Sequence, residues 1–296
     1  MKIAAAGYPI DWHNRWNDYV GKLRVWVRTA AEQGAELLVF PEYAALELAS
    51  LAEEQNARDL QRSIDAVTAR IKDVDELHGS LAREFQVHIC AATAPLRVEG
   101  RTVNRARLFA PDGTHVVQDK LMPGRYETGE WGIAPGGPAR VFETAVGRIG
   151  VLICEDVTFP LIGRAMVEAG AEILLVPSCT DTLRAYAQIR VGAMARALEG
   201  QCVVVHAPTI GDATWMPAVD HNHGTAAVYG PPEAGLPDDG VIAQGKADTA
   251  GWVHADVSLD TLRQARAEGA RVLRDWDAQA TRIGAVEVVS LGSVLA

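Results

Sequence analysis

A segment that occurs twice constrains the fold of this 296-residue chain more than any other feature. Residues 34–41 read Gly-Ala-Glu-Leu-Leu-Val-Phe-Pro, and residues 170–177 read Gly-Ala-Glu-Ile-Leu-Leu-Val-Pro. In each half the repeat lies between an earlier and a later apolar run, at 2–7 and 87–95 in the first half and at 148–154 and 202–208 in the second. Stretches with helical spacing of apolar residues separate these runs, and strands joined through helices pair in parallel. The repeat therefore predicts two β-α-β-α-β halves.

The faces of these elements predict how the halves pack. The helical stretches are apolar on one side only, whereas the strands are apolar on both faces. Two sheets packed face to face, each with helices on its outer side, would bury every apolar face. The expected fold class is therefore α/β, a four-layer α-β-β-α sandwich. Pro111-Asp112-Gly113 predicts a hairpin between the halves. Because no linker or low-complexity stretch interrupts the chain, we expect a single domain over residues 1–296.

Composition and charge exclude several classes of function. Apolar residues make up 48% and charged residues 22% of the chain, as in ordinary globular proteins. The formal net charge of −10 opposes binding to nucleic acid or to an anionic membrane. No apolar run approaches the roughly 20 residues that span a bilayer, and the N-terminus does not read as a secretion signal. The four cysteines lack paired metal spacing, which indicates reduced thiols and a cytoplasmic location.

One of these cysteines is the strongest candidate for a reactive group. Cys154 follows the apolar run 150–153 and precedes an expected helix that starts near Phe159-Pro160. A strand-to-helix turn is where α/β folds expose nucleophiles. A buried cysteine can also serve packing alone, which is the interpretation we give to the three others, Cys90, Cys179 and Cys202.

Two carboxylates and a lysine accompany this cysteine. Glu42 closes the repeat of the first half, Lys120 closes the hairpin, and Glu127 lies seven positions after the lysine. A thiolate attacks a carbonyl or nitrile carbon, a carboxylate accepts and returns protons, and an ammonium group stabilises an oxyanion. A glutamate after a strand is also typical of the first turn of a helix. The combination nevertheless favours a hydrolase.

At these residues the chain resembles the nitrilase superfamily of carbon–nitrogen hydrolases, and its amidase-like branch in particular. Phe40-Pro41-Glu42 is similar to the glutamate motif of that family, and residues 120–123 with Glu127 are similar to its lysine motif. Residues 150–156 with Phe159-Pro160 are similar to its cysteine motif. The resemblance covers nearly the whole chain. It implies Cys154 as nucleophile, Glu42 as general base, Lys120 as oxyanion stabiliser and Glu127 as a positioning carboxylate, without a metal or another cofactor.

The resemblance also implies a substrate class. The expected substrate is a small-molecule amide, with the backbone N–H of Glu155 joining Lys120 at the oxyanion. True nitrilases usually carry tryptophan and glutamate after the cysteine, whereas this chain has Glu155-Asp156, which favours amide hydrolysis. A nitrilase or an N-carbamoyl amidohydrolase that uses the same residues is the alternative.

Other classes of protein stay open on the sequence alone. A Cys-His hydrolase could use His206, His221 or His223, and the last two could begin a metal site. A non-catalytic α/β binding scaffold would leave Cys154 unreactive. The long connection at 209–225 is expected to form a wall of a substrate pocket.

Assembly is the last expectation. The family resemblance implies a homodimer or a higher homo-oligomer. The C-terminal stretch 283–296 gives a physical reason, because a single subunit would expose much of its apolar surface. Its large apolar residues are Val286, Val288, Val289, Leu291, Val294 and Leu295.

Overall fold

The computed structural model describes residues 1–269, 273 and 275–291, and most of its strands lie in two sheets. The first sheet has the order β5 (His115–Asp119), β4 (Arg101–Phe109), β3 (His88–Val98), β2 (Leu37–Val39), β1 (Lys2–Pro9) and β13 (Gly251–Asp256). The second sheet has the order β6 (Val141–Thr144), β7 (Gly147–Val151), β8 (Ile173–Ser178), β9 (Val203–Asp212), β11 (Ala227–Tyr229) and β12 (Val241–Gln244). The short β10 (His221–Asn222) pairs with the end of β9.

The centre of each sheet is parallel, as the repeat predicts. Leu38 of the first repeat pairs with Ala4 of β1 on one side and with Ile89 of β3 on the other. Leu174 of the second repeat takes the same place between β7 and β9. Both copies of the repeat are thus the central strand of a parallel triplet, which confirms the two β-α-β-α-β halves.

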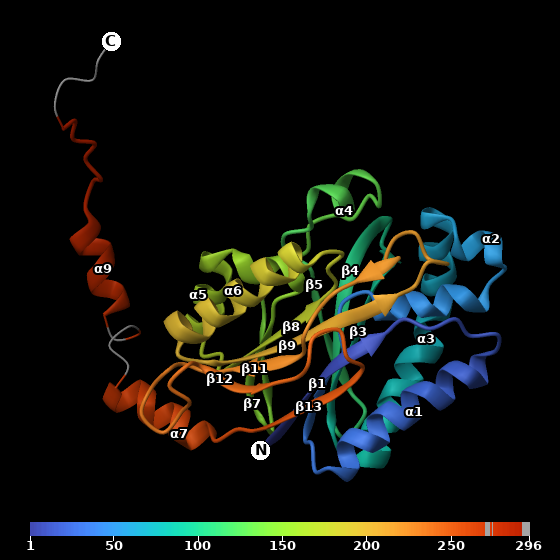
Figure 1. The fold of residues 1–296 in the computed structure, drawn as a ribbon, viewed down its shortest axis with the longest axis horizontal. Helices are drawn as coiled ribbons and strands as arrows, with labels where there is room; N and C mark the ends of the chain where they lie inside the picture. The colour runs from blue at the N-terminus through green and yellow to red at the C-terminus, as the bar shows by residue number, and fades with distance from the viewer. Residues whose placement is uncertain (270–272, 274, 292–296) are drawn as a thin grey trace.

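Helices cover the outer faces of the two sheets (Figure 1). Two of them, α1 (Trp16–Glu32) and α3 (Leu60–Phe85), cover the first sheet, and α5 (Pro160–Glu168) and α6 (Leu183–Gly200) cover the second. The buried residues of β2 show the layering, because successive side chains of a strand point to opposite faces. Leu38 packs in the cluster that holds the inner faces of α1 and α3, whereas Leu37 and Val39 pack in the cluster that contains the second sheet. The expected four-layer α-β-β-α sandwich is confirmed.

The predicted hairpin is also present, since β4 and β5 pair antiparallel around residues 110–114. The structure also contains strands that the sequence analysis did not anticipate, namely β6, β10, β12 and β13. It also joins the two sheets at the ends of β1 and β9, where Tyr8 pairs with Thr209. This junction brings the carboxyl ends of the parallel strands of both halves to the same region.

The remaining elements are short. They are η1 (Ala44–Leu51), α2 (Glu54–Ala57), α4 (Arg125–Gly129), η2 (Cys154–Thr158), α7 (Leu259–Gln264), the π-helical η3 (Ala265–Gly269) and α9 (Trp276–Ile283). Figure 1 shows α9 and the segment after it extending away from the sandwich. The apolar side chains of this segment at 286, 288, 289 and 291 are between 80% and 102% exposed. Val294 and Leu295 lie outside the described residues. In the part of the chain that the structure describes, no helix has the length and apolar character needed to cross a membrane.

Candidate active site

The four residues identified from the sequence come together at the carboxyl ends of the strands. Glu42 follows β2, Lys120 follows β5 and Cys154 follows β7, while Glu127 lies on the short helix α4. Polar groups at the carboxyl ends of strands commonly form the sites of α/β proteins. All four side chains line one cleft of about 1170 Å³.

Cys154 occupies a strained turn directly after β7. It begins η2 with φ of +50°, a left-handed conformation that is uncommon for a residue with a side chain and that often occurs at functional sites. The buried carboxylate of Asp156 fixes this turn, because it accepts N–H bonds from Ile153 at 3.0 Å and from Met122 at 2.7 Å. Asp156 therefore ties the cysteine turn to the lysine segment, and Glu155 is the member of the acidic pair that lines the cleft.

Glu42 is held by three donors and is 1% exposed. Its Oε1 accepts hydrogen bonds from Lys120 Nζ at 2.8 Å and from Asn104 Nδ2 at 2.9 Å. Its Oε2 accepts the backbone N–H of Cys179 at 3.0 Å. Burial raises the pKa of Glu42 to about 7, against the opposing effect of the Lys120 ammonium. A carboxylate with this pKa can both accept and return a proton near neutrality.

Lys120 lies between two carboxylates. Its Nζ is 2.8 Å from Glu42 Oε1 and 2.6 Å from Glu127 Oε2. These contacts use two of its three N–H donors. Burial alone would lower the pKa of Lys120, but the negative groups around it hold that pKa well above its usual value, so the ammonium stays charged.

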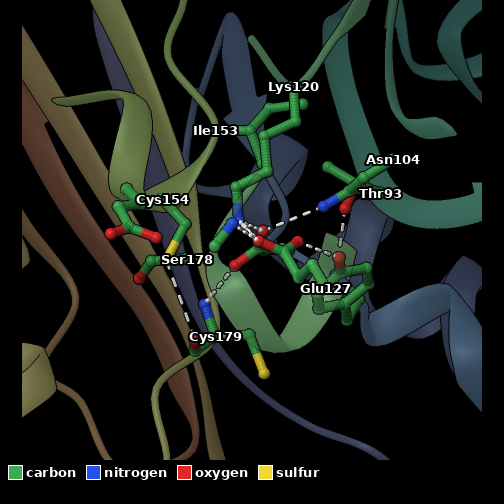
Figure 2. A network of polar contacts seen from close by, with 12 residues as sticks. Thr93, Asn104, Lys120, Glu127, Ile153, Cys154, Ser178 and Cys179 are labelled. Carbon is green, nitrogen blue, oxygen red and sulfur yellow. Dashed lines mark hydrogen bonds and ion pairs between the residues drawn. The ribbon is translucent and has the colours of Figure 1, made fainter. Parts of the chain in front are cut away.

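Glu127 is itself fixed from two sides. Its Oε2 accepts the backbone N–H of Gly124 at 2.6 Å, and its Oε1 accepts the hydroxyl of Tyr43. Burial and the Glu127 carboxylate raise the pKa of Tyr43 well above its usual value, so the phenol remains a donor. Figure 2 shows Lys120 and Glu127 meeting on one side of the network and Cys154 on the other.

The thiol of Cys154 is the protonated partner in this arrangement. Its Sγ donates to the carbonyl oxygen of Cys179 at 3.7 Å. Burial, followed by the negative charge of Glu42, raises the pKa of Cys154 well above its usual value. A neutral thiol therefore lies near a carboxylate with a pKa of about 7, and the ionised form of that carboxylate can accept the thiol proton during attack by sulfur.

The connection at 209–225 forms part of the cleft, as expected. Pro217, Val219 and His221 contribute to its wall, and the aromatic side chains of Tyr43 and Trp131 also line the cleft.

The three histidines considered from the sequence, His206, His221 and His223, each pair with a group other than Cys154. His206 is fully buried and bonds through Nε2 to Ser178 Oγ at 2.8 Å, and burial lowers its pKa to about 3. His221 pairs with Asp212, and His223 pairs with Asp248. Among residues 1–269, 273 and 275–291, no group of three or more histidine, cysteine, aspartate or glutamate side chains is arranged to hold a metal ion.

Three residues of the site escaped the sequence analysis. Asn104 and Tyr43 hold the two carboxylates through their side chains, and Cys179 contacts both Glu42 and Cys154 through its peptide group. Cys179 also lines the cleft, and its side chain packs against a hydrophobic cluster, as expected for a packing thiol. All four cysteines are free. Of these three residues, only Tyr43 could have been assigned to the site from the sequence, because it directly follows Glu42.

Known proteins share this architecture. A family model described as "Carbon-nitrogen hydrolase" matches residues 2–267. The probable hydrolase YhcX of Bacillus subtilis is 29% identical over 93% of this chain, and this chain spans 53% of the length of that protein. The deaminated glutathione amidase of Synechocystis is 28% identical over 80% of this chain and 85% of its own length.

A solved structure shows the same fold. The carbon–nitrogen hydrolase from Helicobacter pylori superposes with a TM-score of 0.77 at 18% identity and covers 96% of this chain and 98% of its own. The match of the family model over 2–267, with the same sandwich fold, leads to one conclusion: this chain is an enzyme of the carbon–nitrogen hydrolase family.

Proposed function

We propose that this enzyme is an amidase that cleaves the C–N bond of a small amide through a cysteine acyl-enzyme and releases ammonia or an amine. The observation that carries the proposal is the buried Glu42 carboxylate, with its pKa of about 7, next to a neutral Cys154 thiol and the Lys120 ammonium. The likeness to a deaminated glutathione amidase supports the amide class.

In the first half-reaction, Glu42 accepts the thiol proton while the sulfur of Cys154 bonds to the amide carbon. The carbonyl oxygen takes the electron pair and becomes an oxyanion. The third N–H of Lys120 and the backbone N–H of Glu155 stabilise that charge. The protonated Glu42 then donates its proton to the amide nitrogen as the C–N bond breaks, which releases the amine and leaves a thioester on Cys154.

In the second half-reaction, a water molecule donates a proton to the same carboxylate and adds to the thioester carbon. Collapse of this adduct breaks the C–S bond, and Glu42 returns the proton to the sulfur. The acid product leaves, and the thiol and the carboxylate regain their starting states. One group thus acts as base and then as acid twice, for which a pKa near neutrality is suited.

Glu127 has a positioning role in this proposal. Tyr43 and Gly124 hold its carboxylate, which in turn holds the Lys120 ammonium. Because this second carboxylate keeps the lysine charged, the ammonium can face the oxyanion without giving its proton to Glu42.

A reducing, cytoplasmic location and a homo-oligomeric assembly remain part of the proposal.

The test is ammonia release across a panel of amides, nitriles and N-carbamoyl compounds, with the intact mass of the protein read in parallel. We expect turnover of amides and a transient mass increase equal to the acyl group. Cys90→Ala, a buried cysteine of β3 outside the cleft, is the matched control and should keep full activity. Catalytic efficiency greater for the nitrile than for the amide of the same acyl group would overturn the amidase proposal. Absence of turnover across the panel, with Cys154 inert to thiol reagents, would favour the binding scaffold.

A further inference from the structure

Asn222 is a buried polar residue behind the wall of the cleft. It lies on β10, is 2% exposed, and uses every hydrogen-bonding group of its side-chain amide. Its Nδ2 donates to the carbonyl oxygens of Val219 at 2.8 Å and Gly211 at 3.1 Å. Its Oδ1 accepts the thiol of Cys179 at 3.1 Å. Two carbonyl acceptors on one side and a thiol donor on the other fix the orientation of the amide.

These contacts connect the wall to the catalytic groups through one residue. Val219 lines the cleft, and Cys179 contacts Glu42 through its backbone N–H and Cys154 through its carbonyl oxygen. The sulfur of Cys179 points away from that of Cys154 (Figure 2), which leaves it free to donate to Asn222. The Asn222 amide therefore contacts Val219 of the wall directly, and it is linked to both Glu42 and Cys154 through one intervening residue, Cys179.

Glu42 and the wall of the cleft, which Asn222 links through Cys179, differ in how directly they depend on Asn222. Glu42 retains Asn104 and Lys120 as donors if Cys179 shifts. The turn of the wall at 213–220 closes through three backbone bonds, and its buried residues Ala213, Met216 and Val219 pack in a hydrophobic cluster. Asn222 bonds this turn directly at Val219, whereas it reaches Glu42 only through Cys179. Loss of Asn222 should therefore displace the wall more than the base.

We propose that Asn222 is a positioning residue that sets substrate affinity by fixing the wall of the cleft to Cys179. This inference rests on the proposed amidase function. It predicts that truncation of Asn222 raises KM while kcat, which depends on Glu42, Lys120 and Cys154, changes little.

The kinetic test uses the best amide of the panel and the variants Asn222→Ala, Cys179→Ala and Cys179→Ser. A hydrogen bond of ordinary strength corresponds to about a tenfold effect, so Asn222→Ala should raise KM about tenfold or more with kcat within about threefold. Cys179→Ala should raise KM by a smaller factor, and Cys179→Ser, which keeps a donor, should restore part of that loss. In the double variant the two effects should not add, because the residues share a bond. Asn17→Ala, at an exposed position of α1, is the matched control.

A second measurement does not depend on the substrate. Hydrogen exchange of peptides covering 209–225 should be faster in Asn222→Ala, whereas peptides from α1 and α3 should keep their wild-type rates. Unchanged exchange in 209–225, or an unchanged KM with kcat reduced, would overturn the positioning role. Faster exchange in a protein that hydrolyses no amide would instead count against the amidase proposal and leave the role of Asn222 in holding the wall.

Discussion

Replacement of Lys120 by methionine tests how the charges of the site work together. The Lys120 ammonium is 3% exposed and lies within 2.8 Å of both carboxylates. Methionine has similar length without the charge, so Lys120→Met leaves Glu42 and Glu127 buried without a cation between them. Two losses follow from this change.

The first loss is that of an oxyanion donor, which costs about 10²–10³ in kcat. The second is the ionised state of the base. The pKa of Glu42 is already about 7 with the ammonium in place, and removal of the ammonium raises it further. Each additional unit reduces the fraction of ionised Glu42 at pH 7 by about tenfold. Together the two effects predict a loss in kcat/KM of about 10³-fold or more at pH 7.

The assay is the pH dependence of kcat/KM by ammonia release, since its acid limb reports the base of the free enzyme. Lys120→Met should shift this limb to higher pH, whereas Lys120→Arg keeps the charge and should shift it less. Lys72→Met, at an exposed position of α3, is the matched control. A kcat/KM for Lys120→Met within tenfold of the wild type, or an acid limb in its original place, would refute the reasoning.

Three further predictions concern the base and the assembly. Glu42→Gln keeps the shape of the side chain but removes proton transfer, so kcat should fall by at least about 10²–10⁴-fold; near-normal kcat would show that another group is the base. In the wild type, kcat/KM should fall about tenfold per pH unit below about pH 7, because protonated Glu42 cannot accept the thiol proton. A kcat/KM that does not change between pH 7 and pH 5 would contradict this assignment. Light scattering should give a mass that is a multiple of 31.8 kDa, because the apolar side chains of residues 286–291 are exposed in the single chain; a 31.8 kDa particle at micromolar concentration would contradict a homo-oligomer.

The parallel core could be predicted from the sequence because the repeat carries its own pattern. Leu38 and Leu174 lie in runs that are apolar on both faces, and such runs require neighbours on both sides. β13 could not be predicted in the same way, since it pairs antiparallel with β1 from the other end of the chain and is only partly buried. Pairings at such a distance leave no local pattern.

The same distinction applies to the site. Glu42, Lys120 and Cys154 end strands and lie within short motifs, so their types and positions could be recognised. Asn104 is one polar residue within β4, and its contact with Glu42 arises only when β4 pairs with β3, which in turn pairs with β2. Cys179 contributes through its backbone N–H and its carbonyl oxygen, and the type of a side chain does not predict such backbone contacts.

The central claim is that Cys154 carries the acyl group. The most direct measurement is ammonia release by Cys154→Ala, at the same protein concentration and thermal stability as the wild type, from the amide that the wild type turns over fastest. We predict that the variant releases ammonia at the rate of the buffer blank while its melting temperature stays close to that of the wild type. Substantial ammonia release by folded Cys154→Ala would contradict the cysteine acyl-enzyme.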